Sequence, residues 1–173
     1  MPSPLEPVPG AAQPNQMCEK LWTLPIGGPR ALEFAILTAA RASEVLLAKR
    51  SEIDRVGRMW IVPKERMKMR REHRVPLCDS ALRIIDTLPQ HTEYLFPGRK
   101  EGKALDHKTL LRVLEIMGVR DTATAHGFRS TFRDWGAEVG DYPNQLLELA
   151  IAHAVGNAAG SAWRRRGFAM TRK

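Results

Sequence analysis

Two pairs of side chains in this sequence have types and spacings suited to phosphate chemistry. His126 and Arg129 lie three residues apart near the expected start of a helix, so both side chains can meet the same ligand. An arginine beside the free amide groups of a helix end is well placed to hold phosphate oxygens. Arg41 is followed three residues later by Glu44, which is placed to orient the guanidinium group. These residues are therefore the first candidates for a functional site.

Each candidate also has a purely structural explanation. His126 can be a capping histidine, and Arg41 with Glu44 can be an ordinary surface ion pair, which contributes little stability. Lys68 lies in a basic stretch that can touch phosphates without reacting, and His153 can be a partly buried, hydrogen-bonded residue after an apolar helix. Taken one at a time, the structural explanations are favoured. Whether these residues form a functional site depends on how the fold positions them relative to one another.

The elements that must position these residues are mostly helices. In residues 30–39, apolar side chains recur at i, i+3, i+4 and i+7, which gives a helix one apolar face, and Pro29 suits its first turn. Further helices are expected at 43–48, 143–152 and 158–165. Another is expected between a cap at Asp79 or Ser80 and its end at Pro89, and the next is capped by Asp106. One more carries the apolar residues Phe128, Phe132, Trp135 and Val139. This pattern predicts a mainly α domain.

A small antiparallel β-sheet accompanies the helices. Residues 59–62 and 73–77 are predicted to be short strands, the second alternating between apolar and polar side chains. The connection between them, residues 64–71, is a strongly basic hairpin tip that carries Lys68. The fold class expected from the sequence is therefore α+β, mainly helical with a small antiparallel sheet.

Composition and charge narrow the classes of partner. The chain has 173 residues, 43% of them hydrophobic, and a formal net charge of +8, which favours a polyanion such as nucleic acid. An anionic membrane is the rival partner, but the basic residues do not follow one amphipathic helix. No apolar stretch is long enough to span a bilayer, and Cys18 and Cys78 give no disulfide framework and no zinc spacing, so we expect a cytoplasmic protein.

The chain divides into two parts of different composition. Residues 1–29 are rich in proline and glycine, without sustained periodicity, and are expected to be a loose arm or the remnant of a linker. Residues 30–173 carry the regular pattern and are expected to form one domain.

Five sequence boxes in order resemble those of the tyrosine recombinases of the phage-integrase type. The boxes are residues 37–45 around Arg41, residues 66–77 around Lys68, the Leu-Phe-Pro-Gly landmark at 95–98, residues 125–132 with His126 and Arg129, and residues 149–156 with His153. The resemblance covers about residues 30–166. It implies the fold of the catalytic domain of this family, shortened at its C-terminal end.

The resemblance also implies a role for each matching residue. Arg41 and Arg129 would clamp the scissile phosphate and offset the charge of the pentavalent transition state. Lys68 would be the general acid that protonates the departing 5′-oxygen, and His126 and His153 would position the phosphate and manage protons. Such enzymes need no metal and no other cofactor. The partner would be double-stranded DNA, with full-length recombinase subunits as a further possibility, and neither a membrane nor a small-molecule substrate is expected.

The basic residues near these boxes are the candidates for DNA contacts. The expected DNA-binding side chains are Lys64, Arg66, Arg70 and Arg71 of the hairpin tip and Arg164 and Arg165 of the C-terminal tail. Binding through them should depend strongly on salt, because each phosphate contact releases counterions.

The chain departs from the family at one decisive position. Ten residues after His153, where similar members carry the nucleophilic tyrosine, this sequence has Trp163. An indole has no hydroxyl group and cannot form the phosphoester bond. Only two tyrosines exist in the chain, Tyr94 and Tyr142, and neither is favoured as a substitute. We therefore expect a recombinase domain that is inactive by itself.

Several alternatives stay open at this stage. A full-length subunit could supply a tyrosine in trans, or water could attack slowly in the vacant site. The chain could also be a non-enzymatic DNA-binding remnant that occupies sites or modulates integrase assemblies. An RNA-binding role is disfavoured because the sequence lacks an aromatic stacking motif.

Overall fold

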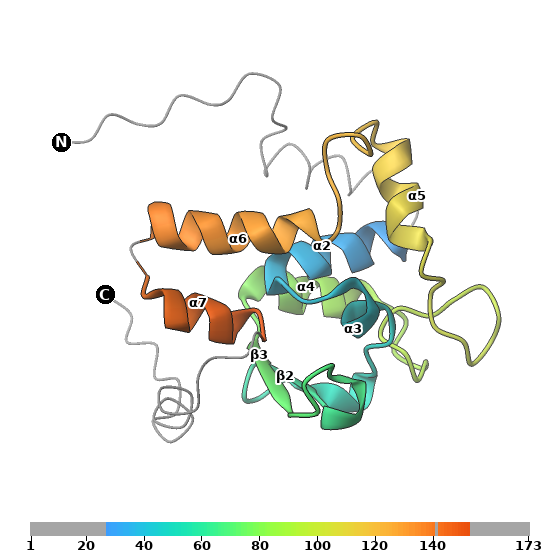
Figure 1. The fold of residues 1–173 in the computed structure, drawn as a ribbon. Coiled ribbons are helices and arrows are strands. Elements are labelled where there is room, and N and C mark those ends of the chain that lie inside the picture. The colour runs from blue at the N-terminus through green and yellow to red at the C-terminus, as the bar shows by residue number, and fades with distance from the viewer. Residues whose placement is uncertain (1–26, 141, 153–173) are drawn as a thin grey trace.

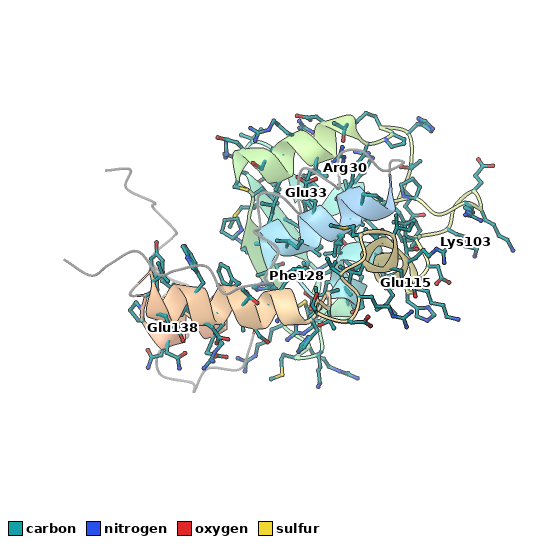
Figure 2. The ribbon with its side chains drawn as sticks, turned by 90° about the horizontal axis from the view of Figure 1, so that it is seen from above. Arg30, Glu33, Lys103, Glu115, Phe128 and Glu138 are labelled. Atoms are coloured by element: carbon teal, nitrogen blue, oxygen red, sulfur yellow. The ribbon has the colours of Figure 1, made fainter. Side chains whose placement is uncertain are left out.

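Helix α2 (Gly28–Thr38) lies at the centre of the fold, surrounded by three other helices (Figure 1). The computed structural model describes residues 27–140 and 142–152. Helices α3 (Ala42–Leu46), α4 (Asp79–Thr87) and α5 (Thr109–Ile116) all contact α2. Because neighbours cover it on several sides, α2 is buried almost all round rather than on one face as predicted. Even Arg30 and Glu33 are buried there, where they form an ion pair of 2.9 Å (Figure 2).

The sheet has three antiparallel strands in the order β1-β2-β3. Strands β2 (Met59–Val62) and β3 (His73–Pro76) pair as expected, with Trp60 opposite Val75 and Val62 opposite His73. Strand β1 (Ile53–Asp54) was not predicted, because two residues are too few to show a period. It follows the 3-10 turn η1 (Arg50–Glu52), and a second 3-10 turn, η2 (Lys64–Arg66), begins the connection from β2 to β3.

The core joins the sheet to α2 through aromatic side chains. The rings of Phe34 and Trp60 lie 5.4 Å apart between centroids, and those of Phe34 and Phe96 lie 5.6 Å apart. All three residues are fully buried, and tilted ring pairs at this separation are favourable beyond the area that they bury. The core therefore fixes the position of the sheet, and of the hairpin that it carries, relative to the end of α2.

The starts of two helices differ from the sequence prediction. Helix α4 begins at Asp79 with Cys78 at the capping position, so Asp79 lies in the first turn instead of capping it. Helix α5 begins at Thr109, and the Asp106 carboxylate accepts a hydrogen bond from the Lys108 amide at 2.8 Å in the turn before the helix. The end of α4 is as expected, because the residue that precedes Pro89 is extended.

Helices α6 (Gly127–Glu138) and α7 (Asn144–Ala150) lie side by side at the edge of the domain (Figure 1). The expected apolar stripe of α6 is partly buried in its first half and exposed in its second. Phe128 packs against the core, whereas Trp135 and Val139 are 52% and 54% exposed. Gly136 allows α7 to approach, because an added Cβ there would collide with the side chain of Leu147. The helix expected at 158–165 lies outside the described residues.

Among the described residues, no helix is both long enough and apolar enough to cross a membrane.

Candidate functional site

Arg41 lies in the turn between α2 and α3, where Glu44 holds it twice. The Glu44 carboxylate accepts one hydrogen bond from the Arg41 backbone amide at 3.0 Å and another from Arg41 Nη1 at 2.7 Å. The Glu44 side chain is 2% exposed and that of Arg41 is 23% exposed. The expectation that Glu44 orients this guanidinium is therefore confirmed. A buried carboxylate bonded at both oxygens leaves the arginine little freedom to move.

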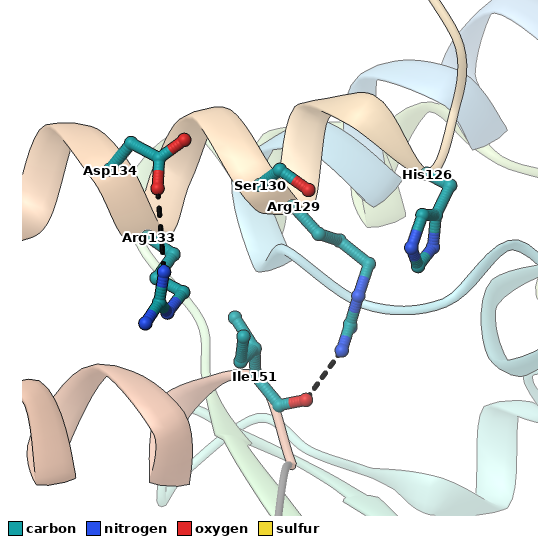
Figure 3. A pocket seen from close by; sticks show the side chains of 6 residues that line it. All are labelled: His126, Arg129, Ser130, Arg133, Asp134 and Ile151. Carbon is teal, nitrogen blue, oxygen red and sulfur yellow. Dashed lines mark hydrogen bonds and ion pairs between the residues drawn. The ribbon is translucent and has the colours of Figure 1, made fainter.

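Arg129 lies at the start of α6 and is buried between the ends of two other helices. Its Nη1 donates to the carbonyl of Ala39, just after α2, and its Nη2 donates to the carbonyl of Ile151 at 2.5 Å (Figure 3). The third group, Nε, is buried, and none of the described residues accepts a hydrogen bond from it. Burial lowers the pKa of Arg129, and the nearby charge of Arg41 lowers it further.

The two arginines converge on the carboxyl end of α7. Arg41 Nη2 donates to the carbonyl of Ala152 at 3.3 Å, next to the Ile151 carbonyl that Arg129 binds. The last carbonyls of a helix carry a partial negative charge and have no partner within the helix. With the Glu44 carboxylate, they offset the repulsion between two guanidinium groups. Ala152 has a left-handed φ of 52°, which turns the chain at this point.

His73 also reaches this cluster, and it was missed in the sequence. Burial lowers the pKa of the imidazole, and the charges of Arg129 and Arg41 lower it further. The Glu44 carboxylate and a hydrogen bond with the backbone of Ala150 act in the opposite direction. A signal for this position existed: His73 shares a strand face with Val75, which points into the core. A histidine on the buried face of β3 is thus the fourth polar side chain of the site.

A shallow pocket opens beside Arg129 (Figure 3). It is lined by His126, Arg129, Ser130, Arg133, Asp134 and Ile151. His126 occupies the capping position of α6 and is exposed, and its side chain lies beside that of Arg129 (Figure 3). Arg133 donates to Glu148 at 2.5 Å and so ties α6 to α7. The predicted pair of His126 and Arg129 is therefore brought together on one side of a helix start.

The basic hairpin tip divides into exposed and buried residues. Lys64, Lys68, Arg70 and Arg71 are exposed. Arg66 is different, because its guanidinium group binds the backbone carbonyl of Glu44 and the carboxylate of Glu52. Lys68 lies on the exposed tip, whereas Glu44 and Arg129 are buried and Arg41 and His73 are partly buried in the cluster. His153, Trp163, Arg164 and Arg165 lie outside the described residues.

Solved structures of recombinases share this fold. A lambda integrase dimer bound to a COC′ core site superimposes with a TM-score of 0.61 at 15% identity, over 92% of this chain and 49% of that chain. The Tn1549 transposon integrase in complex with circular intermediate DNA gives a TM-score of 0.61 at 15% identity, over 93% of this chain and 66% of that chain. The domain therefore has the fold of a tyrosine recombinase catalytic domain, which confirms the expected fold class.

Sequence relatives point to the same class. Prophage integrase IntZ of Escherichia coli (strain K12) is 35% identical over 126 residues, which are 71% of this chain and 31% of that protein. Prophage integrase IntA of the same strain is 32% identical over 144 residues, 81% of this chain and 35% of that protein. The chain thus spans about a third of the length of these curated relatives. Because the model of the phage integrase family matches residues 11–158, the chain belongs to that family.

Proposed function

We propose that this chain is the DNA-binding catalytic domain of a site-specific tyrosine recombinase that cannot cleave DNA by itself. One observation carries the proposal: Arg41, in the turn before α3, and Arg129, on α6, converge on the carboxyl end of α7 and are held there by backbone carbonyls and the Glu44 carboxylate. Two fork-shaped guanidinium groups at one place fit the oxygens of a phosphodiester. The partner proposed for the site is double-stranded DNA, which agrees with the net charge of +8.

The proposed roles follow the chemistry of phosphoryl transfer. Arg41 and Arg129 bind the non-bridging oxygens of the scissile phosphate and stabilise the added negative charge of the pentavalent transition state. Arg129 Nε is a buried donor that a phosphate oxygen can use. His126, on the rim of the pocket, positions the phosphate, and His153 is proposed to share this task. Lys68 is proposed to protonate the departing 5′-oxygen. These groups supply everything except the nucleophile.

Trp163 is the reason to propose inactivity. In related enzymes a tyrosine oxygen attacks the phosphorus, whereas an indole offers no oxygen for that bond. The chain would then bind its site without opening the DNA strand. A full-length recombinase subunit that provides a tyrosine in trans would complete the site, and such a subunit is the second partner that we propose.

The test is a covalent-adduct assay on the purified chain and its Trp163→Tyr variant. The substrate is a library of nicked duplexes, in which loss of the short strand after cleavage traps the protein on the DNA. We expect an adduct from the variant alone, and we expect Arg129→Gln added to that variant to abolish it. Arg83→Gln, an exposed change on α4, is the matched control and should leave the yield unchanged. An adduct from the natural chain would overturn the proposed inactivity.

The second candidate function is that of a DNA-binding protein without a catalytic role. Trp163 favours it, because an indole cannot act as the nucleophile. In that case the Trp163→Tyr variant binds DNA but forms no adduct, while a full-length relative cleaves the same substrate. The affinity of the Arg41→Gln variant would then resemble that of Arg83→Gln, because no phosphate clamp is used.

A further inference from the structure

Arg66 behaves differently from the other basic residues of the hairpin. Four neighbours in the tip are exposed: Lys64, Lys68, Arg70 and Arg71. The side chain of Arg66 is only 16% exposed. It is directed toward the interior, where Nη1 donates to the backbone carbonyl of Glu44 at 3.0 Å and Nη2 donates to the carboxylate of Glu52. Both terminal nitrogens of Arg66 are therefore used inside the protein, and its Nε is buried without an acceptor among the described residues.

Glu52 is a fixed anchor for this arginine. Its Oε2 atom also accepts hydrogen bonds from the Trp60 indole nitrogen at 3.0 Å and from the Lys49 amide at 3.2 Å. Glu52 is 9% exposed, and Trp60 is fully buried in the core. A buried carboxylate with three donors has a defined position, because moving it would leave a charge unpaired. Arg66 is thus tied to the turn η1, whose Glu52 is bonded to the buried Trp60 of β2.

The other contact of Arg66 leads to the phosphate site. Glu44 gives its backbone carbonyl to Arg66 and its carboxylate to Arg41. Met67, the next residue, is buried in the core at 4% exposed, and Lys68 follows it on the surface. Arg66 therefore joins the base of the hairpin, directly before Lys68, to the short helix α3, whose Glu44 orients Arg41. Met67 packs into the core beside it.

We infer that Arg66 is a positioning residue, which locks the base of the hairpin connection (residues 63–72) to α3 and so sets the position of Lys68 relative to Arg41. The inference rests on the proposed function, because it concerns the residue proposed to be the general acid. It assigns Arg66 to the interior of the protein and not to the DNA-binding surface. An arginine with only a structural role would affect folding and DNA binding. Its loss would not selectively slow the step in which Lys68 donates a proton.

The test separates proton donation from the rest of the reaction. In the Trp163→Tyr background, the phenol gives up its proton to the surrounding water as its oxygen bonds to phosphorus, and the bond from phosphorus to the 5′-atom breaks with its electron pair on that atom. A 5′-oxygen then needs a proton from Lys68. A bridging 5′-sulfur leaves as a thiolate and needs none, because thiols are far stronger acids than alcohols. Single-turnover rates on both substrates are compared.

Arg66→Lys keeps the charge but loses the fork that joins Glu44 to Glu52. We expect it to slow cleavage of the oxygen substrate by about 100-fold, as small misplacements of a reacting group do, and to leave the sulfur substrate within about twofold. The double variant Glu52→Gln/Arg66→Met, which leaves no unpaired charge, should show the same rescue by sulfur. Arg70→Met is the matched control from the exposed tip and should affect both substrates equally. Equal losses on both substrates for Arg66→Lys would overturn the inference.

Amide hydrogen exchange tests whether Arg66 holds the hairpin base to α3, and it needs no DNA cleavage. It therefore distinguishes a failure of this inference from a failure of the proposed function. Faster exchange in Arg66→Lys that is confined to residues 67–72 and to helix α3 supports the positioning role of Arg66, even if no adduct forms. Unchanged exchange there contradicts it.

Salt titrations of DNA binding add a third result. Arg70→Met should reduce the slope of log affinity against log salt concentration by about 0.9, and Glu52→Gln/Arg66→Met should leave this slope unchanged. A reduced slope in the double variant would return Arg66 to the DNA-binding surface.

Discussion

Arg129 Nη2 donates a hydrogen bond of 2.5 Å to the backbone carbonyl of Ile151, the residue that follows α7. Its other terminal nitrogen binds the carbonyl of Ala39, so one side chain joins the ends of two helices that are far apart in the sequence. Both carbonyls lack a partner within their own helix. Arg129 is therefore a structural link as well as a candidate for the phosphate clamp.

Replacing Arg129 with lysine should reveal both roles. An ammonium group has one nitrogen where the guanidinium group uses two, so it does not reproduce both bonds in this geometry, and we expect the free energy of unfolding to fall by about 2–3 kcal/mol, measured by urea denaturation. DNA affinity at fixed salt should fall in the same variant. Arg112→Lys is the control, since that side chain is 75% exposed on α5 and the change should stay within about 0.5 kcal/mol. Equal effects of the two substitutions would contradict the assignment.

The buried histidine of the site gives stability a dependence on pH. Folding lowers the pKa of His73 below its ordinary value of 6.5, chiefly through burial. The unfolded chain therefore binds this proton more readily than the folded one, and the free energy of unfolding should fall as the pH drops through about 6.5. The loss ends once the folded imidazole is also protonated.

His73→Gln should remove this part of the acid sensitivity. Urea denaturation between pH 7 and pH 5 should give a flatter stability curve for the variant than for the natural chain. His91→Gln, at an exposed position, should leave the curve as it is. If the two variants follow the same curve, His73 is not a source of the pH dependence.

The close approach of α6 and α7 depends on a glycine. A Cβ at Gly136 would collide with Leu147, which is 3% exposed. Gly136→Ala should destabilise the fold by up to about 2 kcal/mol, because an overpacking cost of about 1–3 kcal/mol outweighs the gain of about 1 kcal/mol in helix propensity. Adding Leu147→Val should restore part of the loss, so that the two changes are not additive. If the changes in unfolding free energy of the two substitutions simply add, the side chains at 136 and 147 do not collide, and the helices have room to separate.

The exposed residues of the hairpin tip should carry part of the salt dependence of DNA binding. Each of Lys64→Gln, Arg70→Gln and Arg71→Gln should lower the slope of log affinity against log salt by about 0.9 if the residue contacts a phosphate. Arg83→Gln on α4 is the control with an equal change in charge. A slope that falls equally in the control would assign the effect to net charge alone.

Local patterns allowed part of the site to be predicted from the sequence. Arg41 and Glu44 are three residues apart, so the contact between them follows from one helical turn. His126 and Arg129 are likewise fixed by the start of α6. The hairpin was visible because its strands flank a basic stretch that lacks apolar periodicity.

The rest of the site depends on contacts between distant segments. Arg66 was expected on the DNA-binding surface, yet its partners Glu52 and Glu44 lie 14 and 22 residues away and turn it inward. His73 reaches the end of α7, which no local period can reveal. Trp135 fitted an apolar helix face but is half exposed, because only the first half of α6 meets the core. Tertiary packing, and not propensity, decides these three positions.

The two described tryptophans occupy opposite environments, which gives the protein two built-in optical reporters. Trp60 is fully buried and its indole nitrogen is bonded to Glu52, whereas Trp135 is 52% exposed on α6. A soluble quencher should therefore reach the fluorescence of Trp135 first, and the emission of Trp60 should shift to longer wavelength only when the core opens. With Trp22 and Trp163 replaced by phenylalanine, one emission spectrum would follow events on the α6 surface and the integrity of the sheet independently.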